Sequence, residues 1–309
     1  MELEPMDQAS TLRRIVNGRQ EPELTRPRLT ERTRVISITS GKGGVGKSNV
    51  VLNLCLTLAA RGKKVMLLDA DMGLANVDVL LGLTPKYTLE HVFSGRQKIQ
   101  DVVLEGPSGL KILPSGSGIS ELSELTFEQQ QNLFSQLSRV AGEMDFLFID
   151  TGAGISSNVL RFNASAGEVL IVANSEPTSI TDAYALMKLL ATKYQIRNFG
   201  LVANSVNSQP DGQGVYDTLK RVCDQFLQVN LHFLGWIPMD PAMRKAVRNQ
   251  TPVVLGAPAA PASRCLVKIA DNLARNPIAS PADFTAQGES EAESKNPGFW
   301  DRLLHWKKL

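Results

Sequence analysis

Short apolar segments alternate with longer amphipathic segments between residues 35 and 275. The short segments are rich in Val, Ile, Leu and Phe, which is typical of buried strands, and the longer ones repeat apolar positions at helical spacing. We expect strands at 35–39, 64–68, 110–113, 146–149, 168–173, 199–203 and 232–237. We expect helices at 47–61, 127–142, 178–193, 214–228 and 261–274. This alternation predicts an α/β fold, a mostly parallel twisted sheet with helices on both faces.

The two ends of the chain differ from this central region. Residues 1–34 are polar and contain prolines, so we interpret them as an arm outside the core, within which 7–16 could form a short helix. Residues 277–296 combine Pro and Gly with an acidic run at 289–293 and have little apolar content. That composition predicts a flexible linker, because it cannot form a core.

The last segment, residues 297–309, has the pattern of a short amphipathic helix. At about 100° per residue, its apolar and charged residues separate onto opposite sides. The apolar arc consists of Phe299, Trp300, Leu303, Leu304 and Trp306. Two tryptophans beside basic residues are typical of a helix that lies in a membrane interface. The alternative is a tail that docks on its own domain or in a partner's groove, and we favour the membrane because the linker separates the tail from the core.

Length and composition narrow the class of protein. A chain of 309 residues with 43% hydrophobic content can bury a sizeable core. Its net charge of +2 is nearly neutral, so no overall electrostatic field indicates binding to nucleic acid. Cys55, Cys223 and Cys265 are far apart, so neither a disulfide framework nor a zinc or iron–sulfur site is expected. Neither a signal peptide before residue 35 nor an apolar run near the ~18 residues of a membrane span is recognisable, so we expect the cytoplasm.

The first predicted strand leads into a glycine-rich loop at residues 40–48, and a predicted helix follows. The loop reads S-G-K-G-G-V-G-K-S, which is the G-x-x-x-x-G-K-S pattern in the context that a phosphate-binding loop requires. Lys47 would reach the β- and γ-phosphates of ATP or ADP, and the Ser48 hydroxyl would bind Mg²⁺. The expected nucleotide contacts are Gly41, Lys42, Gly43, Gly44, Val45, Gly46, Lys47, Ser48 and Asn49. A purely structural turn does not explain two lysines in one loop.

The second lysine, Lys42, makes the loop resemble that of the MinD/ParA family of P-loop ATPases, which carries an extra lysine just after the first glycine. In that family this lysine reaches the phosphates of the partner in an ATP-sandwiched dimer. The resemblance therefore implies a MinD-like ATPase domain at 35–276, a homodimer when ATP is bound, and a catalytic charge that Lys42 supplies to the partner's site.

Carboxylates follow two of the predicted strands. Asp69 and Asp71 end the second strand, and Asp150 ends the strand at 146–149, where a Walker B carboxylate holds a water of Mg²⁺. By resemblance to the family, Asp71 is a catalytic residue of switch I that positions the attacking water, and Asn76 contacts the dimer interface. The expected metal-site residues are Ser48, Asp71 and Asp150. In switch II, Gly152 stands where the family often has proline.

The predicted adenine contacts come from two later strands. Asn204 follows the strand at 199–203, and Pro238 and Asp240 follow the strand at 232–237, where relatives of the family hold adenine. An amide side chain can pair with both donor and acceptor positions of the base.

Two further segments resemble one MinD-like subgroup, the flagellar-number regulators called FlhG or FleN. Residues 7–13 look like its DQAxxLR motif. Residues 177–184 closely match the sequence that this subgroup has in the corresponding segment. The resemblance implies a slow ATPase switch for the number or placement of polar flagella, peripheral on the cytoplasmic face of the inner membrane at the cell pole. The implied partners are the GTPase FlhF through 7–13, a master flagellar transcription activator of the FleQ or FlrA kind, and lipid through 298–309.

Three alternatives share the phosphate loop. A division-site MinD normally begins almost at the loop, so the 34-residue arm argues against it. A ParA-type partition ATPase needs a basic surface for DNA, and Arg244, Lys245 and Arg248 form only a small cluster, so direct DNA binding is not expected. A bacterial tyrosine kinase usually has a tyrosine-rich tail, and this tail contains none.

Overall fold

The computed structural model describes residues 33–71, 77–114, 127–279 and 299–305. Several predicted features lie outside the described residues: nearly all of the arm with its motif at 7–13, Asn76, most of the linker, and the last four residues with Trp306.

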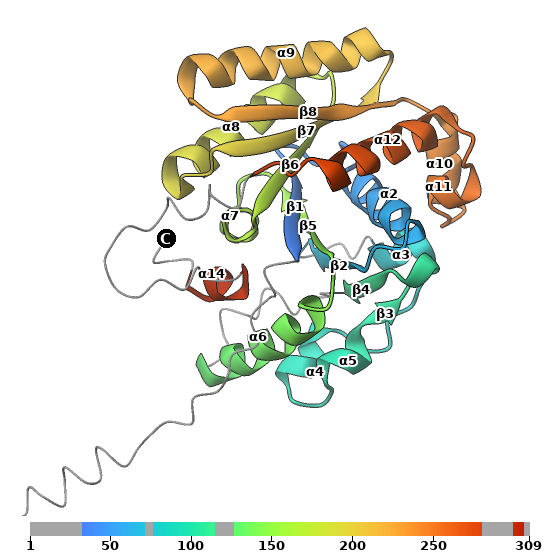
Figure 1. The fold of residues 1–309 in the computed structure, drawn as a ribbon, viewed down its shortest axis with the longest axis vertical. Coiled ribbons are helices and arrows are strands. Elements are labelled where there is room, and N and C mark those ends of the chain that lie inside the picture. The colour runs from blue at the N-terminus through green and yellow to red at the C-terminus, as the bar shows by residue number, and fades with distance from the viewer. Residues whose placement is uncertain (1–32, 72–76, 115–126, 280–298, 306–309) are drawn as a thin grey trace, which may run out of the picture.

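Within the described residues, an eight-stranded sheet forms the centre of the molecule (Figure 1). Its strands, in chain order, are β1 Arg34–Ser40, β2 Val65–Ala70, β3 Leu104–Glu105, β4 Lys111–Pro114, β5 Phe146–Ala153, β6 Glu168–Ala173, β7 Asn198–Val206 and β8 Asn230–Pro238. They lie side by side in the order β3-β4-β2-β5-β1-β6-β7-β8, and all neighbours are parallel except β3 and β4. The predicted mostly parallel sheet is confirmed, and only the two-residue edge strand β3 was not predicted, because it is too short to show a periodic pattern.

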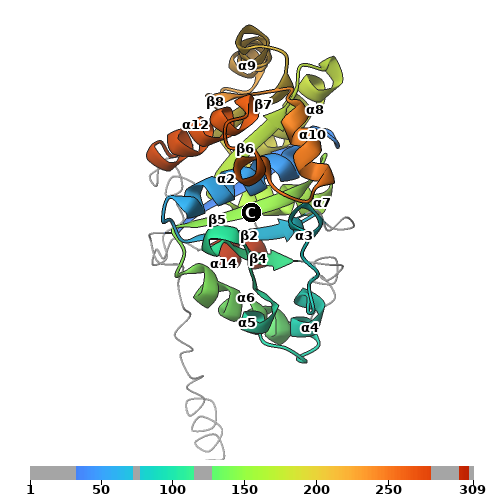
Figure 2. The ribbon, with the colours of Figure 1, turned by 90° about the vertical axis from the view of Figure 1, so that its right-hand side faces the viewer.

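Helices cover both faces of the sheet (Figures 1 and 2). In chain order they are α2 Lys47–Ala60, α3 Val77–Leu81, α4 Leu89–Phe93, α5 Ile99–Val102, α6 Phe127–Ala141, α7 Ser157–Ser165, α8 Pro177–Tyr194, α9 Gln209–Phe226, α10 Pro241–Arg248, α11 Val253–Gly256, α12 Pro261–Arg275 and α14 Phe299–His305, with a 3-10 turn at Pro107–Gly109. The five long predicted helices are present. Helix α9 begins five residues before its predicted start, because the Ser208 hydroxyl accepts a hydrogen bond from Asp211 N and caps it. Helix α7, which follows the predicted Walker B strand, was missed.

The central strands β1, β2 and β6 are buried on both faces, which explains why they read as continuous apolar segments rather than as alternating ones. Ile36 and Ile38 of β1 pack beneath α2 and α12, whereas their neighbour Val35 packs on the opposite face with residues of α6. Every residue of β2 and β6 is buried in the same way.

The C-terminal helix α14 packs against the core, beside α6 and α7 (Figures 1 and 2). Phe299, Trp300 and Leu303 are each at most 4% exposed, and the Trp300 ring stacks on Phe134 of α6 at a centroid distance of 5.8 Å. Docking on its own domain, the alternative considered for this tail, is therefore the arrangement in the structure, and membrane binding stays a prediction. Among the described residues, no helix is both long and apolar enough to cross a membrane.

The amino-terminal edge of the sheet is held by an ion pair between Arg34 and Glu168. Arg34 Nε and Nη2 donate to the two carboxylate oxygens of Glu168 at 2.7 and 2.8 Å, and Nη1 donates to Leu273 O at 2.7 Å. Glu168 Oε2 also accepts a hydrogen bond from Ile278 N at 2.7 Å. The pair thus joins β1, β6, the end of α12 and the residues that follow α12.

We expect Glu168→Gln to lower the free energy of unfolding by about 3 kcal/mol, because removing one partner of a buried ion pair leaves the other charge uncompensated. Urea unfolding followed by circular dichroism measures this loss. The matched control is Asp224→Asn, which breaks the exposed pair between Lys220 and Asp224 on α9 and should cost less than about 1 kcal/mol. Similar losses in the two variants would show that the Arg34–Glu168 pair does not hold the sheet edge.

Candidate functional site

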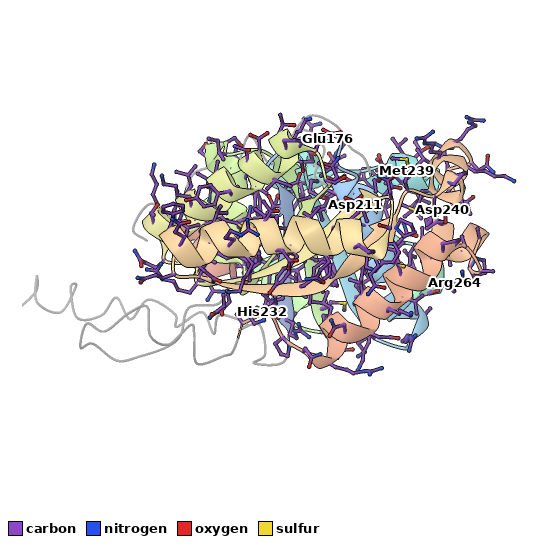
Figure 3. All side chains as sticks on the ribbon, turned by 90° about the horizontal axis from the view of Figure 1, so that it is seen from above. Glu176, Asp211, His232, Met239, Asp240 and Arg264 are labelled. Atoms are coloured by element: carbon purple, nitrogen blue, oxygen red, sulfur yellow. The ribbon has the colours of Figure 1, made fainter. Side chains whose placement is uncertain are left out.

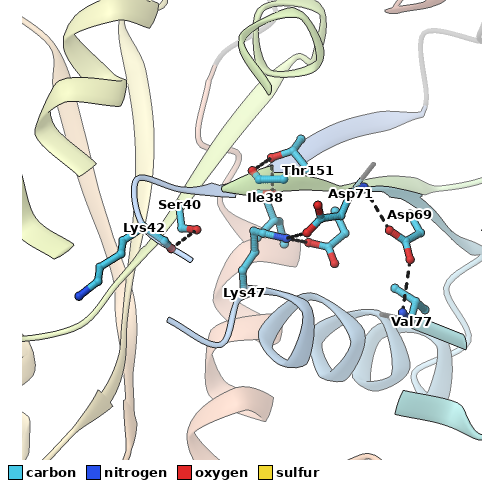
Figure 4. Close-up of polar contacts among 10 residues, drawn as sticks. Ile38, Ser40, Lys42, Lys47, Asp69, Asp71, Val77 and Thr151 are labelled. Atoms are coloured by element: carbon cyan, nitrogen blue, oxygen red, sulfur yellow. Dashed lines mark hydrogen bonds and ion pairs between the residues drawn. The ribbon is translucent and has the colours of Figure 1, made fainter. Parts of the chain in front are cut away.

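The predicted site residues meet at the carboxyl ends of the parallel strands, the edge at which open α/β sheets bind ligands. The loop after β1, Asp71 after β2 and Asp150 in β5 come together there (Figure 4). Figure 3 shows Glu176 and Asp240 on this side of the molecule, away from His232, which lies near the start of β8.

The glycine-rich loop between β1 and α2 has the backbone of a phosphate-binding loop. Gly44 and Gly46 adopt φ of 79° and 88°, a left-handed conformation that favours glycine. Gly46 occupies the N-cap position of α2, and no side chain caps this helix. The first backbone N–H groups of α2 therefore remain suited to phosphate oxygens, in line with the predicted contacts at Lys47, Ser48 and Asn49.

Gly41 packs closely against the backbone of α8, which leaves no room for a side chain. A Cβ atom at Gly41 would lie 2.1 Å from the carbonyl carbon of Asp182 and 2.3 Å from Ala183 N. By contrast, a Cβ atom at Gly43 would meet nothing within 4 Å. The first glycine thus sets the loop directly on the backbone of α8, a contact between distant segments that the motif alone does not show.

Lys47 and two carboxylates form the centre of the site. Lys47 Nζ contacts Asp150 Oδ1 and lies 3.9 Å from Asp71 Oδ2 (Figure 4). Burial raises the pKa of the Asp150 carboxyl above its ordinary value, although the charge and the hydrogen bond of Lys47 oppose this shift. Asp150 Oδ2 is buried without a hydrogen-bond partner.

This arrangement fits a magnesium ion. A buried carboxylate oxygen without a partner is the kind of acceptor that a Mg²⁺ ion or its bound water satisfies. Ser48, Asp71 and Asp150 are the residues of the structure that could hold the ion.

Asp69 accepts hydrogen bonds from the residues on either side of the predicted switch I segment, Asp71 and Val77. Its Oδ1 accepts a hydrogen bond from Asp71 N at 3.2 Å, and its Oδ2 accepts one from Val77 N at 3.3 Å (Figure 4). One buried carboxylate therefore joins the end of β2 to the start of α3, on either side of residues 72–76.

Lys42 points away from Lys47 and does not join the Lys47–Asp150 group (Figure 4). Its Nζ donates to Glu176 Oε2 at 2.7 Å and to Thr178 Oγ1 at 3.0 Å, and its side chain is 40% exposed. The hydrogen bond from Lys42 lowers the pKa of the Glu176 carboxyl. Sequence reasoning missed Glu176, because only the fold brings the residue before α8 next to the loop.

Asn204 and Asp240 make structural contacts at the positions where adenine contacts were predicted. Asn204 is buried and its Nδ2 donates to Val45 O at 2.7 Å, which joins the end of β7 to the loop. Asp240 accepts hydrogen bonds from Ala242 N at 2.8 Å and from Ala262 N at 3.0 Å, so one carboxylate caps both α10 and α12. Pro238 ends β8 beside Val206. Adenine binding by Asn204, Pro238 and Asp240 stays a prediction.

Comparisons with known proteins agree with this geometry. A family model described as "ParA: NUBPL iron-transfer P-loop NTPase" matches residues 31–274. The antiactivator FleN of Pseudomonas aeruginosa is 46% identical over 245 residues, which cover 79% of this chain and 88% of FleN. The flagellum site-determining protein YlxH of Helicobacter pylori is 36% identical over 219 residues, which cover 71% of this chain and 74% of YlxH. The septum site-determining protein MinD of Pyrococcus horikoshii, solved with Mg-ADP, is 27% identical with a TM-score of 0.62, covering 78% of this chain and 96% of that protein.

The three cysteines of this chain lie on three separate helices, Cys55 on α2, Cys223 on α9 and Cys265 on α12. Within the described ranges, no group of three His, Cys, Asp or Glu side chains is placed to hold a metal ion.

We expect Gly41→Ala to destabilise the protein by about 2 kcal/mol, because the added methyl group meets rigid helix backbone and overpacking of this kind costs about 1–3 kcal/mol. Gly43→Ala is the matched control and should change stability by less than about 1 kcal/mol, the usual size of a glycine-to-alanine effect. Thermal unfolding of both variants is measured without nucleotide, so that a difference in stability reports the packing of the added methyl group and not a lost contact with a ligand. Equal stability of the two variants would contradict the close approach of the loop to α8.

Proposed function

Because the chain belongs to the ParA/MinD family of P-loop NTPases, we propose that it is an ATP-driven switch that controls the number or placement of polar flagella. Proteins of this family are ATPases. The 46% identity with FleN over most of both chains, and the similarity to a flagellum site-determining protein, support the flagellar role over division-site placement. In this proposal ATP binding drives homodimerisation, and slow hydrolysis to ADP returns the protein to the monomer.

The observation that carries the proposal is the separation of the two lysines of the loop. Lys47 is buried against the carboxylates of its own site, whereas Lys42 is partly exposed and directed away from them (Figure 4). Exposed ion pairs such as Lys42–Glu176 contribute little and are screened by salt, so this lysine can exchange its partner for a phosphate at low cost. These features support the proposal that Lys42 acts on the nucleotide of a second subunit.

Within one subunit, the contacts of Lys47 suggest how nucleotide is received. Lys47 neutralises the buried Asp150 and would turn toward the β- and γ-phosphates, which leaves Asp150 and Ser48 to hold Mg²⁺. Bound Mg²⁺ would neutralise charge on the phosphate oxygens. Asp71, at 3.9 Å from Lys47 Nζ, would orient the attacking water at the same edge.

Two of the three proposed partners act through the ends of the chain. FlhF would bind residues 7–13, a transcription activator of the FleQ or FlrA kind would bind the switch itself, and lipid of the inner membrane would bind residues 298–309. Each basic residue near an anionic surface is worth about 1 kcal/mol, so one tail binds weakly. A dimer presents two tails, and the second engages intramolecularly, which would place the ATP form at the cytoplasmic face of the membrane, at the cell pole.

We expect Asp71→Ala to bind ATP without hydrolysing it and therefore to accumulate as a dimer with ATP and as a monomer with ADP. Size-exclusion chromatography with light scattering measures the mass of each form. Adding Lys42→Ala should raise the ATP concentration needed for dimerisation at least about tenfold, because a charge-assisted contact is lost. Lys63→Ala, at the opposite end of α2, is the control and should have no effect. A monomer that holds ATP in the Asp71→Ala protein would refute the sandwich dimer.

The flagellar role is tested by complementation. In a Pseudomonas aeruginosa strain that lacks FleN, we expect this chain to restore the flagellar arrangement, counted by electron microscopy. Lys47→Ala should fail at the same protein level, because it removes the lysine that the phosphates require. Full restoration by Lys47→Ala would show that the flagellar role does not depend on ATP binding.

A further inference from the structure

The side chain of Asn204, near the end of β7, is packed directly against the phosphate loop. It is 3% exposed, and its Nδ2 donates to Val45 O at 2.7 Å. A Cβ atom added to Gly46 would lie 2.4 Å from the same Nδ2. The amide of Asn204 therefore occupies the space beside Gly46 that a side chain would need. Glycine is required at this position for packing as well as for its φ of 88°.

The bond from Asn204 also orients the peptide between Val45 and Gly46. Every peptide bond in the described part of the chain is trans, and in a trans peptide the C=O and the N–H point in opposite directions. Because Val45 O faces Asn204, the Gly46 N–H points to the other side of the loop. The N–H groups that follow belong to the first turn of α2, which no side chain caps. Such N–H groups are the donors that a phosphate-binding loop offers to its ligand.

Strand β7 contains a β-bulge at Asn204 and Ser205. Ala203 pairs with Trp236 and Val206 pairs with Pro238, so β7 has one more residue than β8 between these two pairs. Ser205 has a φ of 54°, a left-handed conformation that is uncommon for residues other than glycine, and its side chain is exposed. Bulges of this kind next to active sites aim a side chain, and a strained backbone persists only where its surroundings hold it in place.

We infer that Asn204 is a positioning residue for the phosphate loop and that the bulge at Asn204 and Ser205 holds its amide against Val45 O. The inference rests on the proposed function in one respect, that the ligand of the loop is the phosphate chain of a nucleotide. The bond sets the direction of the Gly46 N–H before phosphate arrives, so less ordering is required on binding. This role differs from the predicted adenine contact, because it acts on phosphate whether or not a base is attached.

A ligand without a base separates the two roles. Binding of ADP and of inorganic triphosphate, each with Mg²⁺, is measured by isothermal titration calorimetry. Asn204→Ala should weaken both ligands by about fivefold to tenfold, the size expected for one lost hydrogen bond. Asn198→Ala is the matched control, because Asn198 lies at the opposite end of β7 and its Oδ1 accepts a hydrogen bond from Asn230 Nδ2 at 2.9 Å. Native affinity for triphosphate beside a weakened affinity for ADP would overturn the inference, since Asn204 would then act on the base alone.

Two substitutions of Ser205 test the bulge without changing Asn204. Valine is β-branched and resists a φ of 54°, whereas glycine adopts it readily. Ser205→Val should therefore weaken binding of triphosphate by a factor similar to that of Asn204→Ala, and Ser205→Gly should keep the native affinity. The side chain at this position is exposed, so neither variant changes the core. Equal affinities of the two Ser205 variants would show that the bulge does not hold the amide in place.

Hydrogen exchange tests the position of the loop in the full chain without any ligand. The Val50 N–H donates to Gly46 O at 3.0 Å, the first hydrogen bond of α2 after the loop. Asn204→Ala should speed exchange of this amide at least about threefold, while amides of β1 keep their rates. Unchanged exchange of Val50 would overturn the inference. If the native chain bound neither ADP nor triphosphate, the proposed function would be refuted, and exchange of Val50 would still decide whether Asn204 positions the loop.

Discussion

A carboxylate buried at the centre of a parallel sheet requires a cation beside it, and much of this structure follows from that requirement. Asp150 is fully buried in β5, and one of its oxygens contacts Lys47 while the other has no partner. The energy of such a group depends on which cation is nearby, since loss of its partner leaves an uncompensated charge. In the proposed function, Lys47 would turn toward phosphate, and Mg²⁺ would replace it as the cation beside Asp150.

The loop that carries Lys47 is held from outside its own motif. Gly41 rests on the backbone of α8, and Asn204 of β7 binds the carbonyl of Val45. Helix α8 also begins beside Glu176, the residue that binds Lys42. Helix α8 and strand β7 therefore both contact the loop that carries the two lysines.

The same sheet face that supports switch II also supports the C-terminal helix. Val159 of α7 lies next to Gly152, and Arg161 binds the carbonyl of Leu303. The tail covers its own aromatic residues by packing on α6 and α7. The apolar face of α14 is thus covered by its own domain in the structure, and its use at a membrane stays a prediction.

The sequence by itself determined the parallel sheet, the long helices and the phosphate loop, because each rests on local periodicity or on a short contiguous motif. It also indicated Lys47 through the loop motif, and Asp71 and Asp150 because residues that follow parallel strands share one edge. The partner of Lys42, the packing of Gly41 and the docking of α14 were decided only by the tertiary structure. These contacts join segments that are distant in sequence. An amphipathic pattern predicts that one face of a helix is buried, but it does not identify the surface against which that face packs.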